Sequence, residues 1–119
     1  YRPYNYHRMI IEARHLKINP SLFPNIYTYD PMGQLKLIYS ISHSNLKAII
    51  KNGYVKFYKK PEAFRLVNKR NYYCSALFLT GTKKTDIIIS HEDYTKYFGS
   101  KVSLKNLSEG NLIIIAKGD

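Results

Sequence analysis

Apolar side chains recur along the first segment of the chain, Tyr4–Lys17, at a spacing that fits one face of a helix. Successive apolar positions are three, one, three and three residues apart, and they are Tyr6, Met9, Ile10, Ala13 and Leu16. This stripe predicts an amphipathic helix with Arg8, Glu12 and Arg14 outside the apolar face. Residues 18–33 are interrupted by prolines and Gly33, so we expect an irregular loop there.

In the next segment the side chains alternate between two faces, which is typical of a half-buried strand over Leu35–Ile41. The predicted inward face carries Leu35, Leu37, Tyr39 and Ile41, and the other face carries Lys36, Ile38 and Ser40. Residues 42–45 then supply hydroxyl and amide groups that can cap a short helix, Leu46–Asn52. We expect Leu46, Ile49 and Ile50 to face inward. Gly53 suits the left-handed conformation that follows a helix.

Further strands are predicted over residues 54–58, 72–80, 86–90 and 111–117, with a turn at 81–84 and a short helix near 102–107. The predicted class is α+β in two small lobes. A helix-strand-helix-strand-strand lobe precedes a mainly β lobe with one short helix. The predicted divisions are 1–33 for the N-terminal helix and the extended proline-containing segment, 34–80 for the α/β lobe, and 81–119 for the β lobe.

Charge is distributed unevenly along the 119 residues. The chain carries 19 Lys and Arg against 8 Asp and Glu, a formal net charge of +11. Residues 1–70 hold 13 of the basic and 3 of the acidic side chains. The densest window, 51–70, contains one acidic residue, Glu62, and seven basic ones: Lys51, Lys56, Lys59, Lys60, Arg65, Lys69 and Arg70. Such an excess favours a polyanionic partner, because each phosphate that a protein neutralises releases condensed counterions. A solvated basic face that only aids solubility is the alternative.

Tyrosines flank this basic window: Tyr54 and Tyr58 on one side, Tyr72 and Tyr73 on the other. Exposed aromatic rings among cations can stack on unpaired bases. The alternative is that these rings only cover a thin sheet. Phe, Tyr, Met, Ile, Asn and Lys, which have AT-rich codons, make up 56 of the 119 residues, as expected for an AT-rich genome such as that of an organelle.

Residues for catalysis or metal binding are not spaced as such chemistry requires. The four histidines show no metal-ligand spacing, and the six glycines stand singly, so neither a metal nor another cofactor is expected. Cys74 is alone and is interpreted as a core residue. His91-Glu92-Asp93 is interpreted as a solvated loop. No apolar run approaches the roughly 20 residues of a membrane-spanning helix, so no membrane partner is expected.

Three further segments have a distinctive order and spacing. The first is the strand, serine-rich cap and helix from Leu35 to Asn52, followed by Gly53-Tyr54-Val55. The second is Ile87-Ile88-Ile89-Ser90 with Tyr97 seven residues after Ser90. The third is Leu104–Leu107, Gly110, Leu112–Ile115 and Lys117-Gly118. Together they resemble the family of small-subunit ribosomal protein eight, which binds small-subunit rRNA, and the resemblance covers about residues 35–118.

The resemblance implies a non-enzymatic, structural RNA-binding protein of the small ribosomal subunit. With the AT-rich composition, we expect a mitochondrial ribosome, although a cytoplasmic or viral source stays open. The expected partners are small-subunit rRNA and neighbouring ribosomal proteins, with no small-molecule substrate. The expected rRNA contacts are the seven basic residues of the 51–70 window together with Ser42, Ser44, Tyr58, Ser90, Tyr97, Lys117 and Gly118.

Two other classes of protein stay open at this point. Leu37–Ser42 followed by Asn45–Ile50 and Gly53 also resembles the opening of ADP-ribosyltransferase-like toxins, which use NAD; Tyr39 and His43 would then be tested for catalysis. A small viral or plasmid DNA-binding protein would carry the same basic window.

Overall fold

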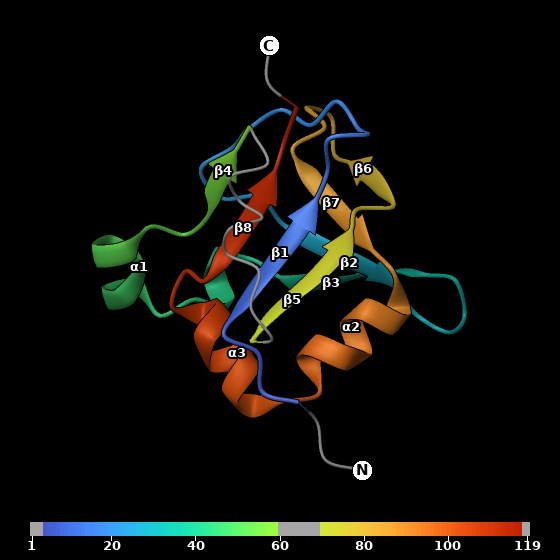
Figure 1. Cartoon of the computed structure of the whole chain (residues 1–119). Helices are drawn as coiled ribbons and strands as arrows, with labels where there is room; N and C mark the ends of the chain where they lie inside the picture. The colour runs from blue at the N-terminus through green and yellow to red at the C-terminus, as the bar shows by residue number, and fades with distance from the viewer. Residues whose placement is uncertain (1–3, 60–69, 118–119) are drawn as a thin grey trace.

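The computed structural model describes residues 4–59 and 70–117. Its core is built from two four-stranded sheets that pack face to face (Figure 1). The first, sheet A, has the order β4 (Lys56–Tyr58), β8 (Leu112–Ile115), β1 (Arg8–Glu12) and β5 (Asn71–Ser75), and all its strands are parallel. The predicted α+β class is therefore confirmed.

Sheet B is mixed. Its order is β3 (Leu35–Tyr39), β2 (Ile26–Tyr29), β7 (Asp86–Ile89) and β6 (Phe78–Thr80). The two central strands are parallel, and each edge strand is antiparallel to its neighbour. Both sheets combine strands from before and after residues 81–85.

Helices α2 (His91–Phe98) and α3 (Lys101–Ser108) lie together at the end of the molecule where the strands of sheet A begin (Figure 1). Helix α1 (Leu46–Asn52) lies beside the β4 edge and follows a 3-10 turn, η1 (Ile41–His43). Both predicted ends of α1 are confirmed. Asn45 Oδ1 accepts a hydrogen bond from the Ala48 amide, and Gly53 has φ 85°.

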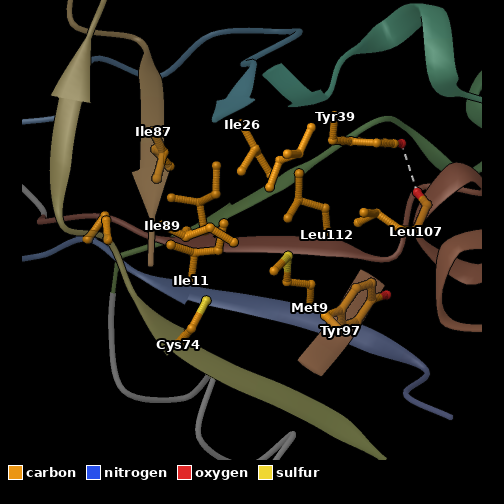
Figure 2. Close-up of a cluster of buried hydrophobic side chains, with 14 of the residues drawn as sticks. Met9, Ile11, Ile26, Tyr39, Cys74, Ile87, Ile89, Tyr97, Leu107 and Leu112 are labelled. Atoms are coloured by element: carbon orange, nitrogen blue, oxygen red, sulfur yellow. Dashed lines mark hydrogen bonds between the residues drawn. The ribbon is translucent and has the colours of Figure 1, made fainter. Parts of the chain in front are cut away.

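The main core lies between the sheets (Figure 2). Met9 and Ile11 of β1 meet Ile26, Ile87 and Ile89 of sheet B, and all five are fully buried. Tyr97 and Leu107 close the end of this core from α2 and α3. The Tyr39 hydroxyl donates to the Leu107 carbonyl at 2.8 Å and so ties sheet B to α3.

A second cluster lies on the opposite, outer face of sheet A. Ile10, Ile113 and Ile115 are at most 3% exposed there, and Tyr58 and Tyr73 pack against them. Strands β1 and β8 are thus buried on both faces, as is typical of central strands in a parallel sheet.

This double burial explains why the predicted helix over Tyr4–Lys17 is wrong. Met9, Ile10 and Ile11 form a continuous apolar run because both faces of β1 need apolar side chains. The more distant apolar residues Tyr6, Ala13 and Leu16 happen to extend that run at helical spacing. Periodicity alone does not separate a short buried strand from a helix.

The prediction of an irregular loop over residues 18–33 is wrong in part, because this segment contains β2, a central strand of sheet B. Three predictions of orientation or extent also need correction. The strand predicted over Tyr72–Thr80 is two strands, because β5 ends at Ser75 in sheet A and β6 begins at Phe78 in sheet B. In β3 the inward residues are Ile38 and Tyr39, since the pairing register shifts between Ile26 and Tyr27. In α1 only Ile49 is buried, and Leu46 and Ile50 are 62% and 86% exposed.

The interpretation of His91-Glu92-Asp93 as a loop is wrong, because these residues form the first turn of α2. Ser90 caps that turn, and its Oγ accepts from the Asp93 amide at 3.0 Å. A serine followed three residues later by an acidic side chain was the signal available in the sequence.

Candidate nucleic-acid interface

The strands of sheet A are parallel, so all four begin toward the same end of the sheet, with Lys56 level with Ile10, two residues further along than Arg8. Lys56 begins β4, Arg8 begins β1, and Arg70 immediately precedes β5. We call these three residues the cationic edge. The sequence prediction had placed Lys56 and Arg70 in one basic window, and the fold adds Arg8 from 48 positions before Lys56.

Helix α3 fixes the position of Arg8. The Tyr6 amide donates to Ser103 Oγ at 2.8 Å, and Asn106 Nδ2 donates to the Tyr6 carbonyl at 3.0 Å. The Met9 amide then donates to the Asn111 carbonyl at 3.0 Å, which sets β1 against the start of β8. The backbone on both sides of Arg8 is therefore held in place.

A small pocket of about 110 Å³ opens at this edge. Arg8 and Lys56 line it together with the Tyr58 ring, and the other lining residues are Gly110, Asn111 and Ile113. Tyr58 and Ile113 belong to the outer-face cluster of sheet A, which places the pocket on that face. Arg8 and Lys56 therefore present their charges from either side of β8.

Arg8 and Lys56 form no ion pair with a carboxylate of the described residues. In the described parts of the chain, ion pairs join Arg14 to Glu12 and Lys96 to Glu92, each at 2.8 Å, and neither involves Arg8 or Lys56. The pKa of His7 is lowered, first by partial burial and then by the charges of Arg8 and Arg70, while Glu109 opposes the shift. The His7 imidazole thus lies in a positive field.

Other predicted cations are spread around sheet A. Lys59 follows β4 and Lys117 follows β8, so both lie at the opposite end of the strands from the cationic edge, and both are exposed. Lys51 is exposed on α1. Lys60, Arg65, Lys69 and Gly118 lie outside the described residues.

The four tyrosines around the basic window divide into two pairs. Tyr54 and Tyr72 belong to the main core, where their hydroxyls donate to the Pro24 carbonyl at 2.9 Å and to Asp93 at 2.6 Å. Burial raises the pKa of both phenols. Tyr58 and Tyr73 instead lie half-buried on the outer face of sheet A, so only these two can present ring surface to a ligand there.

The hydroxyl groups predicted to contact rRNA form hydrogen bonds within the protein. Ser42 Oγ is 2.7 Å from Ser40 Oγ, Ser44 Oγ is 2.8 Å from the Tyr39 hydroxyl, and Ser90 caps α2. Tyr97 is fully buried, and its hydroxyl donates to the Ser103 carbonyl at 3.0 Å. Direct contact between Tyr97 and RNA is therefore incompatible with this fold.

Residues with catalytic potential are engaged in local structure. Cys74 is a buried core residue, as predicted, and burial raises the pKa of its thiol. His43 Nδ1 accepts from the Ser40 amide at 3.0 Å, which completes the cap of η1. Within residues 4–59 and 70–117, no three His, Cys, Asp or Glu side chains gather as metal ligands would. The helices in these ranges are all too short or too polar to cross a bilayer.

A larger hollow of about 520 Å³ lies towards the other end of β5. Its described lining combines apolar side chains of the outer face with two carboxylates, and consists of Ile10, Glu12, Tyr73, Cys74, Ser75, Asp93 and Ile115. The two hollows therefore differ in charge.

The fold and this face define the chain as a compact α+β domain with a cationic edge on a parallel sheet. Residues 8–118 match the family described as Treponema pallidum Tp0624, second domain, and the chain belongs to that family. No curated protein matches the chain. The family takes its name from a bacterial protein.

The pocket residues Arg8, Gly110 and Asn111 are not among those that the sequence indicates as RNA contacts. The sequence pattern predicts Arg8 on the polar side of a helix, and Asn111 is about one hundred positions away along the chain. No local pattern indicates that β1 and β8 are neighbours, so only the pairing of these strands brings the residues together.

Proposed function

We propose that this domain is a non-catalytic RNA-binding module that docks through the cationic edge, where Arg8, Lys56 and Arg70 contact the phosphate backbone. The observation that supports this proposal best is that Arg8 and Lys56 line one pocket without a carboxylate partner in the described residues. Cations that are not neutralised within the protein can release counterions from a polyanion at little internal cost.

Contacts between these cations and phosphate groups fix the position of the RNA but do not distinguish one base sequence from another. Lysine and arginine side chains bind phosphate oxygens, which are the same at every nucleotide. Tyr58 lies between Lys56 and Lys59 in the chain and is half-buried, so its exposed ring surface can stack on one unpaired base. We therefore expect tight, salt-sensitive binding with modest sequence preference.

The narrower form of the proposal is that the RNA is small-subunit rRNA of a mitochondrial ribosome. It rests on the resemblance of the three segments described above and on the AT-rich composition. Sedimentation of the native protein tests it: co-migration with small ribosomal subunits supports the assignment, and a protein that stays at the top of the gradient contradicts it. NAD turnover that is lost on changing Tyr39 or His43 would instead support the toxin-like alternative.

The general proposal is tested by the salt dependence of RNA affinity. We predict that the triple variant Arg8→Gln, Lys56→Gln and Arg70→Gln binds single-stranded RNA more weakly. The slope of log affinity against log salt should be shallower by about 2, because each phosphate contact to a single strand contributes roughly 0.7. Fluorescence anisotropy of a labelled RNA at several salt concentrations measures both quantities.

The matched control removes three exposed lysines elsewhere, Lys17, Lys83 and Lys84, near the β6–β7 turn of sheet B. It lowers the net charge by the same amount, so a general charge effect would change both variants equally. The proposal predicts a near-unchanged slope for the control. Equal slopes for wild type and the cationic-edge variant would rule out docking at this edge.

A further inference from the structure

The pocket at the starts of β1, β4 and β8 has properties that a continuous phosphate backbone does not need. We propose that it binds the terminal phosphate group of an RNA strand, so that the domain prefers RNA ends that carry a monophosphate. This inference rests on the proposed function and specifies which part of the RNA enters the pocket.

The size of the pocket favours a single group. A volume of about 110 Å³ accommodates a tetrahedral oxyanion but not a nucleoside. An internal phosphodiester has a ribose on both sides and would need two exits for the chain. A terminal phosphate needs only one exit, so it can enter the pocket while the rest of the strand stays outside it.

The charge of the pocket points the same way. A phosphate monoester carries about −1.5 to −2 charges near neutral pH, whereas an internal diester carries a single charge. Arg8 and Lys56 supply two positive charges, and the described lining contains no carboxylate. Their hydrogen bonds to phosphate would be charge-assisted, and the Arg8 guanidinium can bind two oxygens at once.

Two of the residues that line the pocket, Gly110 and Asn111, are closely constrained by their neighbours. Gly110 has φ 93°, and its backbone is so close to Gly53 that an added Cβ would collide with the Gly53 carbonyl oxygen. The Asn111 side-chain amide donates to the Asn106 carbonyl at 2.9 Å. A site held in place before the ligand arrives loses less entropy on binding.

The experiment compares two single-stranded RNAs of the same sequence, one with a 5′-phosphate and one with a 5′-hydroxyl. We expect the full chain to bind the phosphorylated strand about tenfold more tightly, the gain of one good charge-assisted contact. Arg8→Gln and Lys56→Gln should each remove most of this preference, and Lys83→Gln should retain it. Circular dichroism confirms that each variant is folded.

A second measurement uses inorganic phosphate as the probe, at constant ionic strength, and follows the backbone amide signals of Arg8, Lys56 and Asn111 by NMR. Shifts confined to these residues support the pocket. Equal affinity for both RNA ends would overturn the inference while leaving the RNA proposal intact. If inorganic phosphate shifts these signals but neither RNA binds, the pocket binds phosphate groups, and the proposal that they belong to RNA is wrong.

Discussion

At the scale of single residues, the pocket of the candidate interface depends on backbone conformation as well as on its charged side chains. Gly110 is the clearest case, because it combines a positive φ with a close approach to Gly53 at the end of α1. An L-residue there would be strained by its conformation and would also collide with backbone atoms. Gly33 has a similar φ of 83°, but nothing lies within 4 Å of a Cβ added there. A substitution at Gly33 therefore shows the conformational strain without the collision.

We predict that Gly110→Ala lowers the free energy of unfolding by about 3 kcal/mol or more, from left-handed strain plus the clash. Gly33→Ala should lose only about 1 kcal/mol, from the strain alone. Urea denaturation of both variants measures the difference. Equal losses would show that the contact between Gly110 and Gly53 does not constrain the fold.

At the scale of elements, serine hydroxyls that the ribosomal resemblance assigns to RNA have roles within the fold. Ser90 is the best-defined example. Its Oγ accepts from the Asp93 amide at 3.0 Å and donates to Asp93 Oδ2 at 2.8 Å, while Asp93 Oδ1 accepts from the Tyr72 hydroxyl at 2.6 Å. This chain of hydrogen bonds joins the start of α2 to β5.

Ser90→Ala should therefore lower the free energy of unfolding by about 1 kcal/mol, the usual effect of losing an N-cap. RNA affinity should stay within error of wild type. Ser108→Ala, which removes a hydroxyl bonded only to the Lys105 carbonyl, is the matched control and should have little effect. Loss of RNA affinity in Ser90→Ala with unchanged stability would instead support a direct RNA contact.

The sequence predicted elements well where caps and turns act locally. The ends of α1, the turn at residues 81–84 and the strand before Ser90 all follow from nearby residues. It failed where tertiary burial decides, as in β1, whose apolar run serves two faces of a sheet. The basic window contains Lys56 and Arg70, which the fold places at the starts of β4 and β5. Nothing near them in the sequence indicates Arg8 or Asn111, which reach the same sheet only through strand pairing.

At the scale of the whole molecule, the buried core and the cationic edge lie in different places. The main core joins the two sheets, and the helices α2 and α3 close the end where sheet A begins (Figure 1). The pocket lined by Arg8 and Lys56 lies toward that same end. RNA binding at this pocket requires phosphate groups to approach the cationic edge. His7 reports on that approach, because its backbone amide donates to the Arg70 carbonyl at 2.6 Å and its side chain responds to both Arg8 and Arg70.

The most direct test is an NMR titration of the His7 imidazole with and without RNA. In the free protein the pKa of His7 should lie below its ordinary value of 6.5, because burial and the neighbouring guanidinium groups disfavour the charged ring. Bound phosphates would offset those charges and stabilise the imidazolium, so the pKa should rise and binding should take up protons as the pH falls through this range. A His7 pKa that stays unchanged while RNA is bound would contradict docking at the cationic edge.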